Sequence, residues 1–227
     1  MKLKYPVVLF WLFACIWAVL AVNPSYRFDW MLENLLVLPF VIFIVWSYKK
    51  FRFSNISYTC IFLFMILHTF GSHYTYSQVP FGYWLQELFN STRNQYDRLV
   101  HFGFGLLLAY PVREIFLRIA ATHGVWGYYL PIELTFAMSA IYEIIEWAVA
   151  VIVNPNAGNS FLGTQGDIWD AQKDMAMAGA GTLASMGITM LINSKIKNNF
   201  RHDIIKSLKV KRKMPLGEKA IKRMMKK

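Results

Sequence analysis

The sequence carries three pairs of acidic or imidazole side chains at helical spacing. In each pair the two residues are three or four positions apart, so both would lie on one face of a helix. Imidazole and carboxylate groups are ligands for Zn, Mn and Fe, and they also serve as general acids and bases. The pairs are Asp97 with His101, Glu143 with Glu146, and Asp170 with Asp174.

The elements that carry these pairs are predicted to be transmembrane helices. Of the 227 residues, 56% are hydrophobic and 16% are charged, whereas an average soluble domain carries about 25% charged residues. This composition excludes an ordinary soluble globule and a disordered chain. A bilayer core about 30 Å thick requires roughly 20 apolar residues per helix. Six such segments are predicted, at residues 5–22, 32–48, 57–76, 96–117, 127–153 and 169–192.

Basic residues between these segments predict the orientation of the helices. They gather at positions 2–4, 49–52, 113–118 and 194–227. Because short basic loops stay on the cytoplasmic side, both termini are predicted to be cytoplasmic. The outward loops are then 23–31, 77–95 and 154–168. The sequence therefore predicts an all-α, polytopic bundle of six transmembrane helices.

The net charge of +11 resides in the C-terminal segment. Residues 1–193 contain 11 basic and 11 acidic residues, and residues 194–227 contain 13 basic and 2 acidic ones. We therefore predict a transmembrane domain at 1–193 and a basic cytoplasmic tail at 194–227. A polybasic segment beside a membrane span is attracted to anionic lipid headgroups. This interpretation is favoured over a specific nucleic acid or a protein partner, because such a tail offers little sequence specificity.

On this topology, acidic and imidazole side chains from four helices converge at the outer end of the bundle. The convergence is independent of the topology, which rests on basic loop residues alone. His68 and His73 are five residues apart, so only one of them faces inward unless the helix is interrupted at Gly71. The converging residues are His68, His73, Asp97, His101, Glu143, Glu146, Asp167, Asp170 and Asp174.

A bound divalent cation would account for this convergence. Burying a carboxylate in a bilayer costs several kcal/mol unless the group is paired, protonated or bound to a metal. Few basic residues are nearby in the sequence, namely Arg93, Arg98 and Lys173. The cluster therefore predicts a site for Zn, Mn or Fe, among which these residue types do not distinguish.

The predicted roles divide the cluster into metal ligands and reacting groups. His101 is expected to bind the metal or to act as general base, and Asp97 to orient it or to share in catalysis. Arg93 and Gln165 are predicted to contact a polar substrate headgroup. The remaining predicted metal ligands are His68, His73, Glu143, Glu146, Asp167, Asp170 and Asp174.

Structural roles are the alternative for several of these residues. Asp167 and Asp170 also fit the start of a helix, where a carboxylate accepts hydrogen bonds from backbone N–H groups. Asp97 and His101 also fit a hydrogen-bonded pair that only orients two helices. Glu143 and Glu146 lie too deep in an apolar segment for capping, which favours a functional role for both.

Four segments resemble the YjdF-type family of bacterial inner-membrane proteins, and the resemblance covers roughly residues 5–192. It implies a fold and a location but no reaction. The segments are 67–74 (LHTFGSHY), 96–105 (YDRLVHFGFG), 142–147 (YEIIEW) and 163–175 (GTQGDIWDAQKDM).

A weaker resemblance links the chain to VanZ-like proteins, which are associated with glycopeptide resistance and the cell envelope. Asp97, His101 and Phe102 match the first element of that pattern. Glu146 stands where VanZ-like chains tend to have Gln, and Asp174 where they usually have Asn. The resemblance implies a shared fold more than a shared substrate.

These observations favour a metal-dependent hydrolase that acts on lipid or lipid-linked cell-envelope substrates. A metal at the outer surface would activate water beside lipid headgroups. A transporter for protons or divalent cations is the first alternative, because intramembrane carboxylates often mark ion pathways. A non-catalytic envelope or sensor protein is the second. The sequence contains no nucleotide-binding loop, serine-hydrolase elbow or haem-attachment motif.

Overall fold

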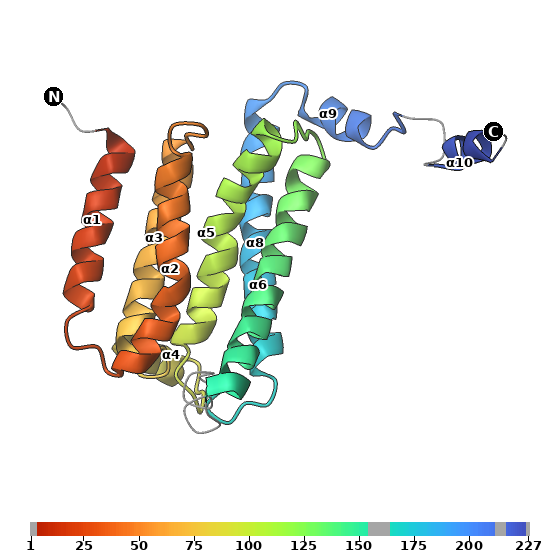
Figure 1. The fold of residues 1–227 in the computed structure, drawn as a ribbon. Coiled ribbons are helices and arrows are strands. Elements are labelled where there is room, and N and C mark those ends of the chain that lie inside the picture. Colours follow the sequence, from red (N-terminus) through yellow and green to blue (C-terminus); the bar gives the residue numbers. More distant parts are fainter. Residues whose placement is uncertain (1–3, 154–163, 212–216, 226–227) are drawn as a thin grey trace.

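The computed structural model describes residues 4–153, 164–211 and 217–225, and all regular structure within them is helical (Figure 1). This confirms the predicted all-α fold. The helices are α1 (Tyr5–Leu20), α2 (Arg27–Ser47), α3 (Asn55–Tyr74), α4 (Pro80–Leu88), α5 (Tyr96–Arg118), α6 (Trp126–Val153), α8 (Asp170–Ile196), α9 (Phe200–Ser207) and α10 (Glu218–Met224).

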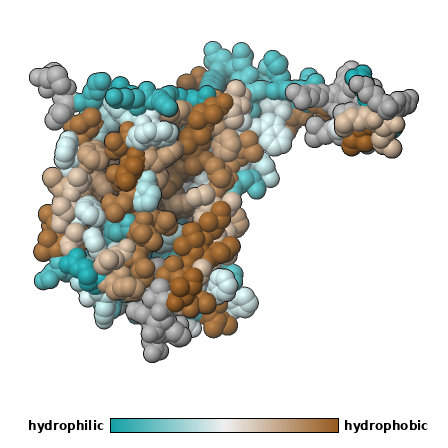
Figure 2. Space-filling model, viewed as in Figure 1, coloured by the Kyte–Doolittle hydropathy of each residue, from teal (hydrophilic) through white to brown (hydrophobic). Residues whose placement is uncertain are grey.

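Five of these helices are long and apolar enough to cross a membrane, namely α2, α3, α5, α6 and α8. The sixth predicted span is the shorter helix α1, whose 16 residues extend about 24 Å. In a space-filling view the side of the bundle is largely hydrophobic, and a hydrophilic band follows one end (Figure 2). The chain is therefore a polytopic membrane protein.

Successive long helices run in opposite directions (Figure 1). The loops at 48–54 and 119–125 lie at the same end as α9, and the loops at 21–26, 75–95 and 164–169 lie at the other. These two sets correspond to the predicted cytoplasmic and outward loops. Which end faces the cytoplasm stays a prediction from the basic residues.

Small residues let α5 and α8 approach closely. A Cβ atom on Gly181 would lie 2.8 Å from the backbone nitrogen of Leu106 and closer still to the carbonyl oxygen of Phe102. On the other helix of this contact, a Cβ atom on Gly105 would lie 2.7 Å from the backbone nitrogen of Thr182. Helix α6 packs against both α5 and α8, so these three helices form the part of the bundle that positions the acidic cluster.

The loop at 75–95, predicted to face outward, contains helix α4, which the sequence pattern did not predict. Asn94 connects this loop to α5: its side-chain nitrogen donates to the Val79 carbonyl at 2.9 Å, and its side-chain oxygen accepts from the Tyr96 backbone nitrogen at 3.0 Å. Asn94 is fully buried. It thereby fixes the neighbouring Arg93 at the start of α5.

At the other end, the first part of the basic tail is helical and docks on the loop before α6. The backbone nitrogen of Val125 donates to the Ser207 hydroxyl at 2.9 Å, and the Trp126 indole donates to the Ser207 carbonyl at 3.0 Å. Helix α8 ends at Ile196, so the predicted boundary at 193 falls in its last turn.

Candidate metal centre

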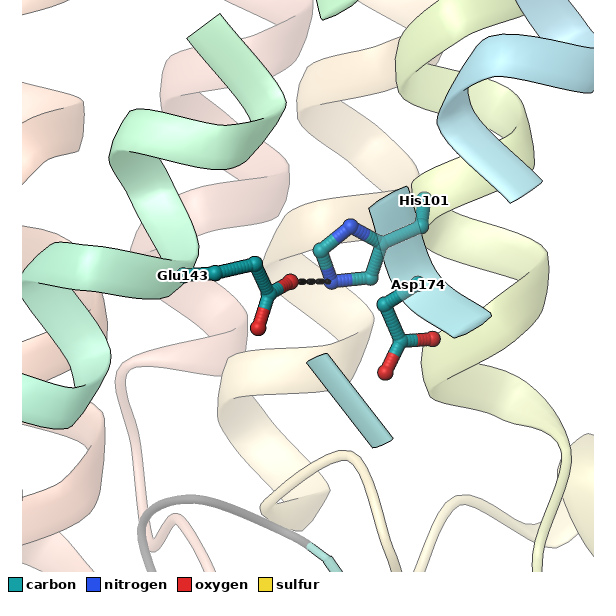
Figure 3. A group of neighbouring side chains, drawn as sticks. All are labelled: His101, Glu143 and Asp174. Atoms are coloured by element: carbon teal, nitrogen blue, oxygen red, sulfur yellow. Dashed lines mark ion pairs between the residues drawn. The ribbon is translucent and has the colours of Figure 1, made fainter. Parts of the chain in front are cut away.

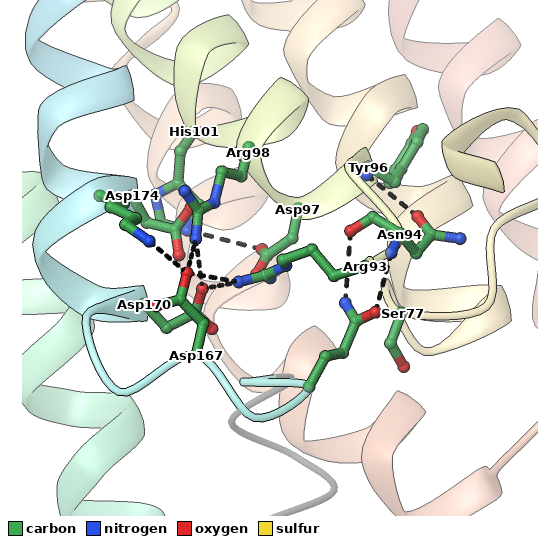
Figure 4. Close-up of polar contacts among 12 residues, drawn as sticks. Ser77, Arg93, Asn94, Tyr96, Asp97, Arg98, His101, Asp167, Asp170 and Asp174 are labelled. Carbon is green, nitrogen blue, oxygen red and sulfur yellow. Dashed lines mark hydrogen bonds and ion pairs between the residues drawn. The ribbon is translucent and has the colours of Figure 1, made fainter. Parts of the chain in front are cut away.

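Two arginines and three aspartates form a buried ion-pair network where α5 and α8 meet (Figure 4). Arg93 pairs with Asp170, and its guanidinium lies 3.4 Å from Asp97. Arg98 lies 2.8 Å from Asp167 and 3.0 Å from Asp170. Each arginine therefore joins the start of α5 to the start of α8, which stabilises this end of the bundle.

Asp167, just before α8, combines capping with ion pairing. Its side chain accepts from the Trp169 backbone nitrogen at 3.1 Å and lies 2.7 Å from the Lys173 ammonium group. Lys173, the Trp169 N–H group and Arg98 hold the pKa of the Asp167 carboxyl well below its usual range. Asp170 instead accepts from both arginines.

Deeper in the bundle, three side chains from three helices point toward one another (Figure 3). They are His101 of α5, Glu143 of α6 and Asp174 of α8, and we call them the metal-centre triad. The Nε2 atom of His101 lies 3.4 Å from Oε1 of Glu143. One possible ligand atom from each residue lies within 4.8 Å of the other two.

Two oxygen atoms of this triad lack a hydrogen-bond partner among the described residues. They are Oε1 of Glu143 and Oδ1 of Asp174, and both are shielded from solvent. Asp174 is only 2% exposed, and its Oδ1 lies 3.7 Å from the Arg98 Nε atom. Buried carboxylate oxygens without donors are costly, so their arrangement suits a bound cation.

Asp97 adds a carboxylate on the same side of the imidazole. Its Oδ1 lies 3.6 Å from the Nε2 atom of His101, the nitrogen that Glu143 also approaches. A carboxylate that orients a ligating histidine binds the other ring nitrogen. Asp97 therefore lies on the ligand side of His101. With Asp170 and Asp174 it forms a second group whose ligand atoms lie within 4.8 Å of one another.

Three predicted site residues have contacts outside the triad. The side chain of Gln165 accepts from the Asn94 backbone nitrogen at 2.9 Å and donates to the Asn94 carbonyl at 3.3 Å. Helix α3 is unbroken through Gly71, so its two histidines diverge, as expected for that case. His73 bonds to the carbonyl oxygen of Leu20 at 2.7 Å. His68 bonds to the Tyr76 hydroxyl at 2.6 Å.

A second polar group, which the sequence analysis did not include, adjoins the triad. The Tyr142 hydroxyl donates to Oε2 of Glu33 at 3.2 Å, and the Tyr142 ring packs edge-on to His101. Glu146 lies close enough to Glu33 and Glu143 to interact with both electrostatically. Glu33 could have been found from sequence, because an ionisable residue inside an apolar span is itself a functional signal.

The charges at this end do not balance if every group is ionised. Besides Arg27, Asp29 and Glu87, seven carboxyl groups and three basic side chains lie at this end within the described residues. Like charges packed at low dielectric require protons or a counter-cation. The carboxyl groups belong to Glu33, Asp97, Glu143, Glu146, Asp167, Asp170 and Asp174, and the basic groups to Arg93, Arg98 and Lys173.

Comparison with known proteins agrees with this architecture. The chain matches the family described as "Predicted membrane protein (DUF2238)" over residues 5–195. It is 37% identical over 161 residues to "Inner membrane protein YjdF" of Escherichia coli (strain K12), and this match covers 70% of the chain and 77% of that protein. No solved structure matches the chain, and the likeness to VanZ-like proteins stays a prediction. The chain thus belongs to the YjdF-type (DUF2238) family and is a multi-pass protein of the bacterial inner membrane.

Proposed function

We propose that the metal-centre triad binds a divalent cation and that the protein hydrolyses a lipid or lipid-linked cell-envelope substrate. The observation that supports the proposal is the pair of buried carboxylate oxygens beside His101, Oε1 of Glu143 and Oδ1 of Asp174, which make only long ion pairs and have no hydrogen-bond partner among the described residues. Ligand atoms that share one ion at about 2.1 Å lie roughly 3 to 3.5 Å apart. The 3.4 Å between His101 and Glu143 is already in this range, and Asp174 requires only a small shift.

The ligand set indicates the class of cation. One imidazole and two carboxylates suit Zn, Mn or Fe better than a soft metal ion that prefers thiolate ligands. A cation there would also offset part of the excess negative charge at this end of the bundle. When bound, it would lower the pKa of a coordinated water to about 7.

The chain's own residues divide the remaining tasks. Asp97 lies 3.6 Å from the triad imidazole and is the proposed general base, since it has a carboxylate beside the place where water would bind. Arg98 and Arg93 hold the neighbouring aspartates and keep the start of α8 against α5. In this proposal the arginines fix the site and do not bind substrate on their own.

The depth of the triad supports a lipid substrate. His101 is five residues from the start of α5 and Asp174 is four residues from the start of α8, which places them about 6 to 8 Å inside the helix ends. Glu143 is ten residues from the end of α6, or about 15 Å. These depths correspond to lipid headgroups and the upper acyl chain, where a bond in a lipid-linked molecule can reach the site.

The test is elemental analysis of the detergent-purified full chain after mild chelation and dialysis. The parent is expected to retain about one equivalent of Zn, Mn or Fe, and the double variant Glu143→Gln/Asp174→Asn is expected to retain none. Glu133→Gln, an exposed change on the same helix α6, is the matched control and should keep the metal. Equal metal content in the parent and the double variant would contradict the site.

Hydrolysis is tested separately from metal binding. Metal-loaded protein is incubated with envelope lipid extracts, and release of a water-soluble product is measured for the parent and for Asp97→Asn. Loss of release with retained metal would support the role of Asp97. Metal binding without any release, together with a lower melting temperature in the double variant, would favour the non-catalytic alternative.

Transport of protons or divalent cations is the second candidate, and buried hydroxyl groups favour it. Thr135 and Ser139 are each 1% exposed, and their hydroxyls lack partners among the described residues. They share a face of α6 with Glu143, at spacings of four residues. Polar side chains also follow one face of α8 toward the opposite end of the bundle. These are Asp174, Thr182, Ser185, Thr189 and Asn193, the last bonded to Tyr128 at 2.8 Å.

This second candidate predicts flux across a sealed membrane. The protein is reconstituted into vesicles that contain a dye sensitive to pH or to Mn²⁺. Under an imposed gradient of protons or of Mn²⁺, the dye should report entry of that ion into the vesicles. The variant Thr135→Val/Ser139→Ala should slow the flux without changing the metal content. No flux above that of protein-free vesicles leaves hydrolysis as the proposal.

A further inference from the structure

An apolar cavity lies between α1, α2 and α3, at the end of the bundle opposite the metal-centre triad. Its volume is about 230 Å³. Helices α1 and α2 each pack against α3, and the cavity occupies the space between the two. Its walls are Pro6, Val7, Leu9, Phe10 and Phe13 of α1, Phe40, Val41, Ile44, Val45 and Tyr48 of α2, and Tyr58, Ile61, Phe62 and Met65 of α3.

We propose that this cavity binds one acyl chain of an anionic glycerophospholipid, from the leaflet on the basic side of the protein. The proposal is independent of the metal-centre triad, which lies near the starts of α5 and α8; these helix starts are at the end of the bundle opposite the end of α2 (Figure 1). Three observations carry it: the dimensions of the cavity, a tyrosine hydroxyl at its mouth without a partner among the described residues, and basic residues at the same end of the bundle.

The dimensions match one leaflet of the bilayer. Along α2 the lining extends from Phe40 to Tyr48, which is eight residues or about 12 Å. One leaflet contributes about 15 Å of hydrocarbon. The cavity therefore extends from the membrane surface to near the bilayer midplane, and aliphatic and aromatic side chains line it throughout this length.

Tyr48 and Tyr58 both line the surface end of the cavity, and the Tyr58 hydroxyl accepts from the Phe53 backbone nitrogen at 3.4 Å. The hydroxyl oxygen of Tyr48 is buried and has no hydrogen-bond partner among the described residues. Tyr48 directly follows α2, and its ring lies 6.2 Å from that of Tyr58 across the cavity. A buried hydroxyl without a partner is costly. A glycerol ester or phosphate oxygen at headgroup depth would accept its hydrogen bond.

Basic residues follow immediately at the mouth. Lys49, Lys50 and Arg52 come directly after Tyr48, and exposed Lys4 precedes the α1 residues of the lining. The Arg52 guanidinium lies 5.6 Å from the centre of the Tyr48 ring. Figure 2 shows a hydrophilic band at this end of the molecule. The Lys50 ammonium group lies 5.2 Å from the centre of the Trp46 ring, on the outer face of α2. Lys4, Lys49 and Arg52, at the same end of the bundle as the cavity mouth, favour an anionic headgroup over a zwitterionic one.

The experiment is native mass spectrometry of the purified full chain, delipidated and then supplied with phosphatidylglycerol or phosphatidylcholine. The parent should retain one phosphatidylglycerol molecule per chain and little phosphatidylcholine. Each basic residue strengthens binding to an anionic surface about fivefold, so Lys49→Gln/Lys50→Gln/Arg52→Gln should weaken retention about a hundredfold. Tyr48→Phe should weaken it about fivefold through the lost hydrogen bond.

A pair of neighbouring substitutions separates the cavity from general lipid contact. Val41→Trp fills the cavity and should abolish retention. Ile42→Trp adds the same bulk to the outer face of α2, where Ile42 is exposed, and should leave retention unchanged. The substitutions in Lys49→Gln/Lys50→Gln/Arg52→Gln are outside the apolar cavity, so this variant tests the proposal even if Val41→Trp does not fold.

Three outcomes would overturn the proposal. Equal retention of the two lipids by the parent shows an adventitious detergent-like contact. Equal loss in Val41→Trp and Ile42→Trp places the lipid elsewhere. If the parent is a dimer without bound lipid, and Val41→Trp converts it to a monomer, the cavity is occupied by a second copy of the chain.

Discussion

Asp167 shows how one side chain outside the membrane can lock two helices together. Its carboxylate meets Arg98 of α5 and Lys173 of α8, at 2.8 and 2.7 Å. These groups hold its folded-state pKa below that of the unfolded chain, which is about 3.9. A depressed pKa contributes stability above the unfolded value, and this stability is lost as the pH falls through the folded value.

The corresponding prediction concerns Asp167→Asn. The variant should melt at a lower temperature than the parent, by a constant amount between pH 5 and pH 8. The difference should shrink below about pH 4, where the Asp167 carboxylate of the unfolded parent begins to gain its proton while that of the folded parent is still ionised. Differential scanning fluorimetry in detergent measures it. A difference that widens toward acid, or that is absent at pH 7, contradicts the assigned ion pairs.

At the same scale, the sequence predicts which residues share a face but not which atoms meet. The four-residue spacing placed Asp97 beside His101, and the structure agrees. It could not show that Asp97 and Glu143 approach the same nitrogen, because that depends on side-chain rotamers and on the rotation of α6. Nor could spacing show that Gln165 bonds to the backbone of Asn94, a contact between two loops.

Among elements, the contact between α5 and α8 sets the geometry of the triad, because these helices carry His101 and Asp174. Gly181→Ala places a methyl group against the backbone of α5 and should destabilise the protein by about 1–3 kcal/mol. Gly187 lies on the same helix with nothing within 4 Å of an added Cβ. Gly187→Ala should therefore be neutral or stabilise by up to about 1 kcal/mol.

Thermal unfolding and metal content together check this prediction. Gly181→Ala should lower both the melting temperature and metal retention, because separating α5 from α8 moves His101 away from Asp174. Gly187→Ala should change neither by much. If the two substitutions behave alike, the close approach of the helices is not what holds the site.

The elements themselves could largely be predicted, because apolar segments of about 20 residues have few alternatives in a membrane. The exceptions have physical reasons. Helix α4 lies in a polar loop and has only nine residues, too few for an apolar span. Helix α2 begins at Arg27, five residues before the predicted span. The prediction started late because the first turns of the helix carry Asp29 and other polar residues, which do not count as apolar span.

For the whole molecule, the two ends differ in chemistry. One end gathers the carboxyl groups and the metal-centre triad, and the other carries the basic loops, the lipid cavity and the tail docked through Ser207. A basic end is retained on the cytoplasmic side during insertion. The asymmetry therefore predicts that the triad opens toward the outside and that both termini are cytoplasmic.

Cysteine labelling in intact cells tests this orientation, after the native Cys15 and Cys60 are replaced by alanine. Glu87→Cys on α4 and Lys209→Cys after α9 put single thiols at exposed positions of opposite ends. A membrane-impermeant maleimide should label the first in intact cells and the second only after lysis. Because successive long helices run in opposite directions (Figure 1), the side assigned to one loop determines the orientation of the whole bundle. One labelling result opposite to the expected one would therefore reverse the assigned orientation. Labelling of Lys209→Cys in intact cells would place the acidic triad in the cytoplasmic leaflet, and the envelope substrate proposed above would then be excluded.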